Sequence, residues 1–231
     1  GGGVKFPWLL ASCGFFAALP ASAGEAVPAA SFQEEVAERV NAERAGCTGP
    51  GCPLPPLKLA PVLSEVADRH SRAMARDDFF SHCDFPTGLH LPDRLQRAGY
   101  AYSAAAENLA GGVGTPAAAM AQWMQSPPHR FHLLDPEYRE LGVGYFRQDG
   151  DLGNVDRDTN GDCDCRDSGE TCRGDALDHY WTQLFGRRDG VYPLVIAGGR
   201  QATASAEVEV YLYSPPGAAH MRLRNDGGSW S

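Results

Sequence analysis

Residues 123–130 read WMQSPPHR, and their mixture of apolar, proline and histidine residues predicts how the chain is organised around them. Upstream, Thr115-Pro116 is typical of a helix start, because threonine caps free N–H groups and proline fits the first turn. The inward face of that helix is expected to carry Ala119, Met120 and Trp123. Since residues 126–128 interrupt the pattern with two prolines, we expect the helix to end there and His129–Leu134 to form a further helical turn.

Three more helices are expected upstream. Residues 31–34, SFQE, form a capping box, in which serine and glutamate satisfy free backbone N–H groups at a helix start. That helix is predicted to run to about Ala45. A second helix is predicted from Ala60 to Arg76, with a buried stripe of Val62, Leu63, Val66, Ala67 and Met74. Residues 92–98 are predicted to form a short helix that ends at Gly99, because glycine favours the left-handed C-cap position.

Strands are expected in the second half of the chain, at Glu140–Phe146 and His179–Phe185. Residues 151–178 between them carry nine acidic side chains and three arginines, so most of the net charge of −9 is concentrated there. We interpret this segment as an acidic insertion between paired strands. Residues 193–231 contain one clear alternating strand, Val208–Tyr213, and are predicted to be a β-rich extension that begins a truncated β-sandwich module.

The first 23 residues have the pattern of an export signal. An apolar run at residues 6–19 follows a lysine, and residues 21–23 are small, so we expect a signal peptide at residues 1–23 with cleavage before Gly24. The run is short and interrupted by proline, which argues against a transmembrane helix. The alternative is a lipobox that would make Cys13 a lipid-anchored N-terminus. The signal peptide predicts a secreted protein, extracellular or periplasmic, whereas the lipobox would give an exported protein anchored to a membrane by lipid at Cys13.

The cysteines support the same compartment. Seven are present, and loss of Cys13 with the signal would leave six, an even number that favours disulfides in an exported chain. These six are Cys47, Cys52, Cys83, Cys163, Cys165 and Cys172. Cys47 and Cys52 are placed to close a small loop, whereas Cys163 and Cys165 are too close along the chain to bond easily. The remaining pairings stay open.

The bulk composition limits the classes of function. A chain of 231 residues with 43% hydrophobic side chains suffices for one domain with a packed core and a smaller addition. The negative charge opposes nucleic-acid binding by an electrostatic surface. The sequence contains neither a Gly-x-Ser-x-Gly nucleophile turn nor a His-Glu-x-x-His metal motif. These observations favour a protein that is not an enzyme.

Five short motifs follow one another along the middle of the chain. They are Phe79–His82 (FFSH), Ala106–Leu109 (AENL), Trp123–Arg130 (WMQSPPHR), Glu140–Tyr145 (ELGVGY) and Tyr180–Gln183 (YWTQ). In this order they resemble the bacterial branch of the CAP/SCP superfamily, the cysteine-rich secretory, antigen 5 and pathogenesis-related 1 proteins. The resemblance implies an α+β fold, a three-layer α-β-α sandwich over residues 31–192 that contains the acidic insertion and is followed by the β extension.

The family also implies a cleft. In many animal and plant members, two histidines and two glutamates line it and bind a divalent metal. By resemblance, His82 and Glu107 stand at the first histidine and first glutamate positions, while Ser126 and Tyr180 stand at the other two. Bacterial members carry a histidine after the Ser-Pro pair, which His129 matches. The candidates are therefore His82, Glu107 and His129, acting as zinc ligands, as an acid–base group, or as a hydrogen-bonded structural cluster.

A second chemical signal lies in the insertion. Residues 156–167, DRDTNGDCDCRD, place oxygen donors at the alternating positions of a calcium loop and a glycine where the loop must turn sharply. They resemble the loops of EF-hands and, more closely, of thrombospondin type-3 repeats. The predicted calcium ligands are Asp156, Asp158, Asn160, Asp162, Asp164 and Asp167. The alternative is a solvated acidic loop.

Together these features predict a secreted, non-enzymatic binding or scaffold protein with a calcium-stabilised loop. The CAP resemblance allows a small molecule, a lipid or a protein as the ligand. The alternative function is a metal-dependent hydrolase of peptide or envelope material that uses His82, Glu107 and His129.

Overall fold

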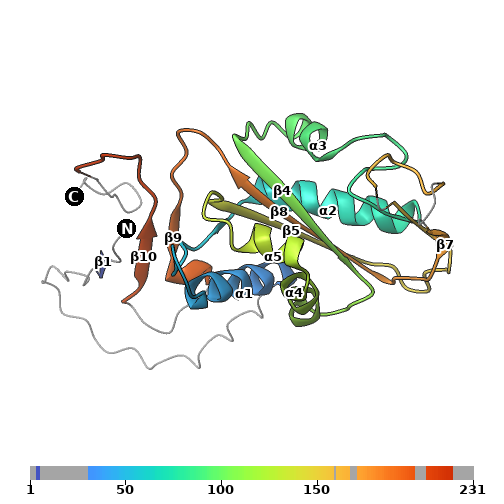
Figure 1. Cartoon of the computed structure of the whole chain (residues 1–231), viewed down its shortest axis with the longest axis horizontal. Coiled ribbons are helices and arrows are strands. Elements are labelled where there is room, and N and C mark those ends of the chain that lie inside the picture. Colours follow the sequence, from blue (N-terminus) through green and yellow to red (C-terminus); the bar gives the residue numbers. More distant parts are fainter. Residues whose placement is uncertain (1–3, 6–30, 159, 167–170, 201–206, 221–231) are drawn as a thin grey trace, which may run out of the picture.

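The computed structural model describes residues 4–5, 31–158, 160–166, 171–200 and 207–220 (Figure 1). The predicted signal peptide lies outside the described residues, apart from the two-residue strand β1 (Val4–Lys5). Cys13 and the predicted calcium ligand Asp167 also lie outside them.

A four-stranded sheet forms the centre of the domain. Its strands lie in the order β2 (Lys58–Leu59), β5 (Glu140–Arg147), β8 (His179–Arg187) and β4 (Ala104–Gly111). β8 pairs antiparallel with both β5 and β4, and β2 runs parallel to β5. The predicted pairing of the two strands that flank the insertion is therefore confirmed, whereas β4 was not predicted.

Helices cover both faces of this sheet (Figure 1). They are α1 (Phe32–Gly46), α4 (Pro116–Gln125) and α5 (Pro127–Leu133) on one side, and α2 (Pro61–Arg76) and α3 (Leu91–Arg97) on the other. Alternation along β8 explains both layers, because successive strand residues point to opposite faces. Trp181 and Phe185 pack with α1 and α4, while Leu184 packs with α2 and α3. The α+β class is confirmed.

Glycine lets α2 lie directly on the sheet. A Cβ atom at Gly142 or Gly144 would clash with the backbone of α2 at Leu63 or Ala67. A larger side chain at either position would therefore push the helix away from β5. This close contact fixes α2, which carries the buried His70.

The described part of the acidic insertion forms a small lobe at one end of the domain (Figure 1). Its strands β6 (Val155–Arg157) and β7 (Thr171–Gly174) form a small sheet with β3 (Phe79–Phe80), in the order β3-β6-β7. Its base is closed by buried Asp151, which accepts hydrogen bonds from the backbone N–H groups of Leu177 and Asp178 at 2.8 and 3.0 Å. The insertion is therefore attached to the domain by both pairing and side-chain contacts.

Three disulfides join the six cysteines that were expected to remain after export. They are Cys47–Cys52, Cys83–Cys163 and Cys165–Cys172. The prediction of the Cys47–Cys52 pair is confirmed. The other two both involve the insertion, one within it and one that connects it to the segment after β3.

The described part of the C-terminal extension packs against the domain. It contains β9 (Leu194–Ile196), a short 3-10 helix (Ala197–Gly199) and β10 (Glu209–Leu212), and β10 lies between β9 and β1. Buried Asn41 donates to the carbonyl of Gly198 at 2.8 Å, and the Tyr213 hydroxyl donates to the carbonyl of Pro56 at 3.1 Å. These contacts attach the extension to α1 and the loop that follows it.

Candidate functional site

A buried ion pair lies beneath the predicted cleft. The carboxylate of Glu107 projects from β4 with 3% of its side chain exposed, and the Arg94 guanidinium reaches it from α3 with 8% exposed. Arg94 donates to Oε2 of Glu107 at 2.8 Å and to Oε1 at 3.0 Å. This two-pronged contact matches the fork of a guanidinium to a carboxylate, which makes the pair both strong and geometrically specific.

His82 completes a cluster that we call the cleft triad: His82, Arg94 and Glu107. Nδ1 of His82 lies 2.9 Å from Oε1 of Glu107, and Arg94 also donates to the backbone carbonyl of His82 at 2.8 Å. Because a carboxylate only accepts hydrogen bonds, Nδ1 must carry the proton, and neutral His82 keeps its lone pair on Nε2. The side chain of His82 is 55% exposed, so its ring lies at the protein surface.

The charge of Glu107 is secured by its neighbours. Burial by itself would raise the pKa of the Glu107 carboxyl. The charge of Arg94 and the hydrogen bonds from His82 and Arg94 outweigh burial and hold the pKa well below its usual range. Glu107 is therefore ionised at neutral pH, and its charge is neutralised inside the protein.

A second imidazole is oriented in a similar way on the helix α5. Asn108 uses its amide N–H groups to donate to the carbonyl of His129 at 3.1 Å and to Oε1 of Gln183 at 3.0 Å. Its oxygen is left to accept from Nδ1 of His132, at 2.9 Å. His132, like His82, therefore keeps its Nε2 lone pair when neutral.

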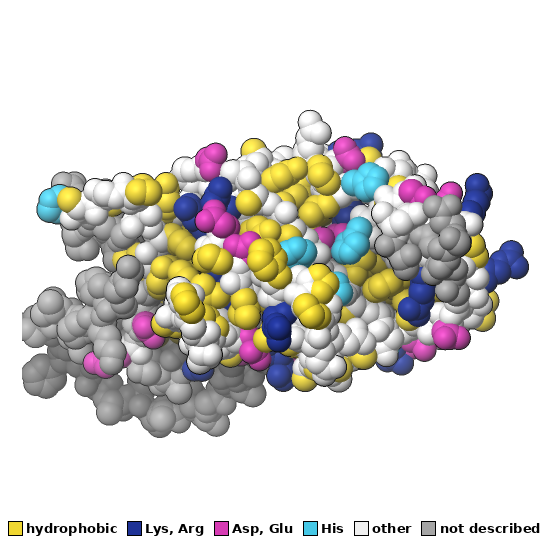
Figure 2. All heavy atoms as spheres, in the orientation of Figure 1, with side chains coloured by type: hydrophobic (Ala, Val, Ile, Leu, Met, Phe, Trp, Pro, Cys, Tyr) yellow, Lys and Arg dark blue, Asp and Glu magenta, His cyan; other side chains and the backbone are white. Residues whose placement is uncertain are grey.

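His82, His129 and His132 lie near enough to influence one another. Burial lowers the pKa of both His129 and His132, and the neighbouring His82 lowers each further. Several histidines gather on one face of the molecule among hydrophobic side chains (Figure 2). The sequence singled out His129 but missed His132, whose only signal was its place three residues further along the same short helix.

A fourth histidine, His70, lies behind the triad. It is 1% exposed, and its Nε2 lies 2.9 Å from the backbone carbonyl of Ser81. Nε2 therefore donates, since a carbonyl only accepts. Burial lowers the pKa of His70 to about 4, so it is neutral at pH 7. Sequence reasoning also missed Arg94, whose arginine alone carries no sign of a distant carboxylate partner.

The cleft residues do not fit a zinc ion as they are arranged. Both oxygens of Glu107 are held by a guanidinium, whose charge would repel a metal. Tyr180, at one of the remaining family positions, is fully buried and donates its hydroxyl to Asp151 at 2.6 Å. Within the described residues, the possible ligand atoms of His82, Glu107 and His129 do not all lie within 4.8 Å of one another.

The predicted calcium loop folds back on its own backbone. Asp158 accepts from the N–H groups of Asn160, at 3.1 Å, and of Gly161, at 2.6 Å. The same side-chain-to-backbone pattern repeats at Asn160, Asp162 and Asp164, each accepting from the residue two positions later. Gly161 has a φ of 85°, as the sharp turn requires. In the described part of the loop, no three carboxylates converge within 4.8 Å.

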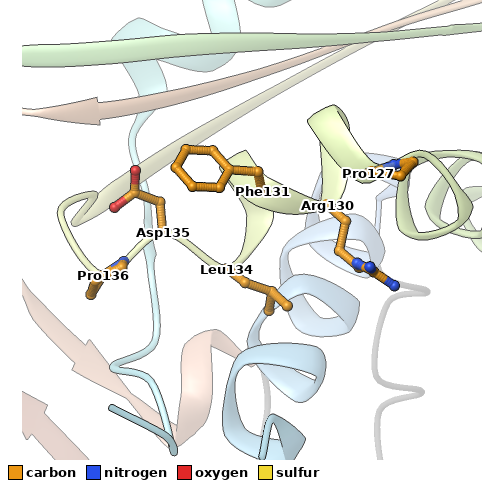
Figure 3. A pocket seen from close by; sticks show the side chains of 6 residues that line it. All are labelled: Pro127, Arg130, Phe131, Leu134, Asp135 and Pro136. Atoms are coloured by element: carbon orange, nitrogen blue, oxygen red, sulfur yellow. The ribbon is translucent and has the colours of Figure 1, made fainter. Parts of the chain in front are cut away.

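An open hollow of about 330 Å³ lies beside α5 (Figure 3). Its lining consists of Pro127, Arg130, Phe131, Leu134, Asp135 and Pro136. Phe131 is 67% exposed, and Figure 3 shows its ring between Asp135 and Arg130. The cleft triad does not line this hollow.

Comparisons with known proteins agree with this architecture. The sequence model of the cysteine-rich secretory protein family, CAP, matches residues 37–185. An uncharacterized protein of Bacillus subtilis, YkwD, is 34% identical over 115 residues, which cover 50% of this chain and 42% of YkwD. The uncharacterized membrane protein YlbC of the same organism is 38% identical over 85 residues, 37% of this chain and 24% of YlbC. The matches thus span less than half of each relative.

A solved structure is also similar. It is an extracellular protein containing an SCP domain from Bacillus anthracis, with 27% identity and a TM-score of 0.50. The similarity covers 68% of this chain and 40% of that chain. Within the part of this chain that the structure describes, no helix is long and apolar enough to cross a membrane.

Proposed function

This chain belongs to the cysteine-rich secretory protein family, CAP, and from that membership we propose that it is a secreted, non-enzymatic binding or scaffold protein whose ligand docks in the cleft at His82. The proposal rests on the contacts that the Glu107 carboxylate makes. Its carboxylate is committed to Arg94 and to Nδ1 of His82, so it orients a side chain instead of meeting a substrate.

The hydrogen-bonding pattern indicates what kind of ligand the cleft would hold. Both His82 and His132 donate from Nδ1 to a protein oxygen and offer Nε2 as an acceptor. A matching ligand would present hydroxyl, amide or ammonium donors, whether it is a small molecule, a lipid headgroup or a protein. The hydrogen bonds at Nδ1 already orient both rings. Less conformational entropy is therefore lost when a ligand binds to their Nε2 atoms.

Two observations support an extracellular location. Three disulfides join the described cysteines, which is typical of proteins that leave the reducing cytosol. The similar structure from Bacillus anthracis is named as an extracellular protein.

Ligand binding is tested by NMR on protein labelled in its histidine rings. The probes are chitin oligosaccharides, lysophospholipid micelles and a mixture of peptides, added separately. We expect one class to shift the ring signals of His82 and His132 while exposed His220 in the extension stays unchanged, and to lose affinity in His82→Gln. Failure of all three classes to shift either ring would contradict the proposed cleft ligand.

A hydrolase is the alternative that the His82–Glu107 pair keeps open, since a carboxylate-oriented imidazole is an arrangement used for general bases. It is tested with fluorogenic peptides and purified cell envelopes. Turnover by the wild type that disappears in His82→Gln would replace binding by catalysis as the function. Metal analysis belongs to the same test, and equal, near-zero zinc contents in the wild type and His82→Ala would dispose of a zinc enzyme.

We also propose that calcium orders the acidic insertion. Support comes from the oxygen donors at alternate positions of residues 158–164, each of which accepts a hydrogen bond from a backbone N–H of the loop two residues later. Calorimetric titration should show one site, which Asp158→Ala/Asn160→Ala removes and the exposed control Asp149→Ala retains. No heat and no gain in thermal stability with the wild type would end the calcium proposal.

A further inference from the structure

The acidic insertion touches both neighbours of His82. We propose that it is a positioning element of the cleft, which holds His82 against Glu107 through Ser81, Asp158 and the Cys83–Cys163 disulfide. This inference rests on the proposed function only in treating His82 as the ligand-facing residue. It describes a coupling between two segments whose contacts join residues 77 and 80 positions apart in the chain.

Backbone pairing brings the two segments together. β6 of the insertion runs parallel to β3, with Phe79 opposite Asp156 and Phe80 opposite Arg157. The pairing begins with the N–H of Asp156, which donates to the carbonyl of Asp78 at 2.8 Å. β3 ends two residues before His82, so the insertion fixes the direction in which the chain enters the cleft.

Ser81, directly after β3, holds the turn that leads to His82. Its side chain is buried, and its hydroxyl donates to Oδ2 of Asp158 at 2.8 Å while accepting from the N–H of Cys83 at 2.8 Å. Its carbonyl accepts from His70 at 2.9 Å. The insertion thus supplies, through Asp158, one of the three contacts that hold the residue before His82.

The disulfide fixes the residue after His82. Cys83 is fully buried and bonded to Cys163 of the insertion, with 5.3 Å between their Cα atoms. Among the residues that the structure describes, the side chain of His82 hydrogen-bonds only to Glu107, and it is half exposed. Besides its contacts with Glu107 and Arg94, the orientation of this half-exposed ring depends on the backbone on either side of it, and the insertion holds both neighbouring residues.

The tautomer of His82 reports this positioning directly. Ring nitrogen shifts of a neutral imidazole distinguish an Nδ1–H ring from an Nε2–H ring. In the wild type we expect the Nδ1–H form, held by Glu107. In Cys83→Ser/Cys163→Ser the Nε2–H fraction should rise by about tenfold, since a hydrogen bond to a charged group is worth about that factor.

Two controls are built into the molecule. His132 lies on α5 and is held by Asn108 of β4, not by a residue of the insertion, so its ring should stay in the Nδ1–H form in the same spectrum. Cys47→Ser/Cys52→Ser removes a disulfide outside the insertion and should leave His82 unchanged. A merely destabilising effect would move both rings or neither.

A single substitution keeps the test decisive if the cysteine variant does not fold. Asp158→Ala retains the disulfide and removes the contact to Ser81, and the His82 tautomer should again shift, by a smaller amount. A folded Asp158→Ala or cysteine variant with the wild-type His82 spectrum would overturn the inference. Because the readout needs no ligand, a shifted tautomer in a protein that binds none of the probes would refute the proposed function alone.

Discussion

Two carboxylates, Glu107 of the cleft triad and Asp158 of the insertion, are both stabilised in the charged form, but by different partners. Burial would raise the pKa of each, yet neighbours lower both. Glu107 is paired with Arg94 and with His82, 25 residues away, whereas Asp158 is held largely by backbone N–H groups two to five residues along the chain. The cleft therefore depends on long-range packing, while the loop carries most of its own support. Their responses to substitution should differ accordingly.

Removal of the cleft cation should have the largest effect. Arg94→Met leaves Glu107 buried without its counter-charge, and we expect a loss of about 3–5 kcal/mol in the free energy of unfolding at neutral pH. Chemical denaturation measures it. The matched control, Arg69→Met, breaks the exposed ion pair with Glu65 and should change stability by less than about 0.5 kcal/mol.

The same variant should change the way in which Glu107 makes the free energy of unfolding depend on pH. In the wild type the pKa of Glu107 is lowered, so its stabilisation is present above the unfolded-state pKa and is lost as pH falls through the folded-state value. In Arg94→Met the charge and hydrogen bonds of Arg94 no longer oppose burial, the His82 hydrogen bond opposes it only in part, and the pKa of Glu107 should rise. The stability gap between the two proteins should then narrow toward about pH 4. A constant gap would contradict the assignment of Arg94 as the neutralising charge.

Titration of His70 should have the second largest effect on stability, and this effect appears only below neutral pH. The unfolded chain protonates His70 below its ordinary pKa of 6.5, whereas the folded protein resists protonation until about 4. Its contribution is therefore lost as pH falls through this window, by about 3 kcal/mol. His70→Gln keeps a donor for the Ser81 carbonyl and should flatten the dependence of the unfolding midpoint on pH. The exposed control His220→Gln should retain the wild-type slope.

The base of the insertion should respond least. Asp151→Ala removes the acceptor for two backbone N–H groups and for the hydroxyl of Tyr180, and we expect a loss of about 1–2 kcal/mol. Hydrogen exchange should show faster opening at Leu177 and Asp178, with the sheet core unaffected. Asp151→Asn, which keeps one oxygen, should cost less. Uniformly faster exchange would instead show that the insertion unfolds together with the domain.

Local signals in the sequence predicted several elements well. The capping box at Ser31 and the Thr115-Pro116 start are confirmed, since each rests on contacts within one helical turn. β4 was missed because its sequence, AAAENLAG, has little strand propensity. It is a strand because eight of its residues pair with β8, a partner about 75 positions away. The arrangement of the site depended on this missed strand, which carries both Glu107 and Asn108.

The sequence by itself determined the family, the α+β class, the acidic insertion and two members of the cleft triad, because ordered motifs, charge and periodicity are properties of neighbouring residues. Only the tertiary structure decided that Arg94 neutralises Glu107, that His132 joins the histidines, and that Cys83 pairs with Cys163. These facts depend on distances between residues far apart in the chain. Such distances are set by how the helices pack on the sheet, and a buried charge is stabilised only by what that packing brings beside it.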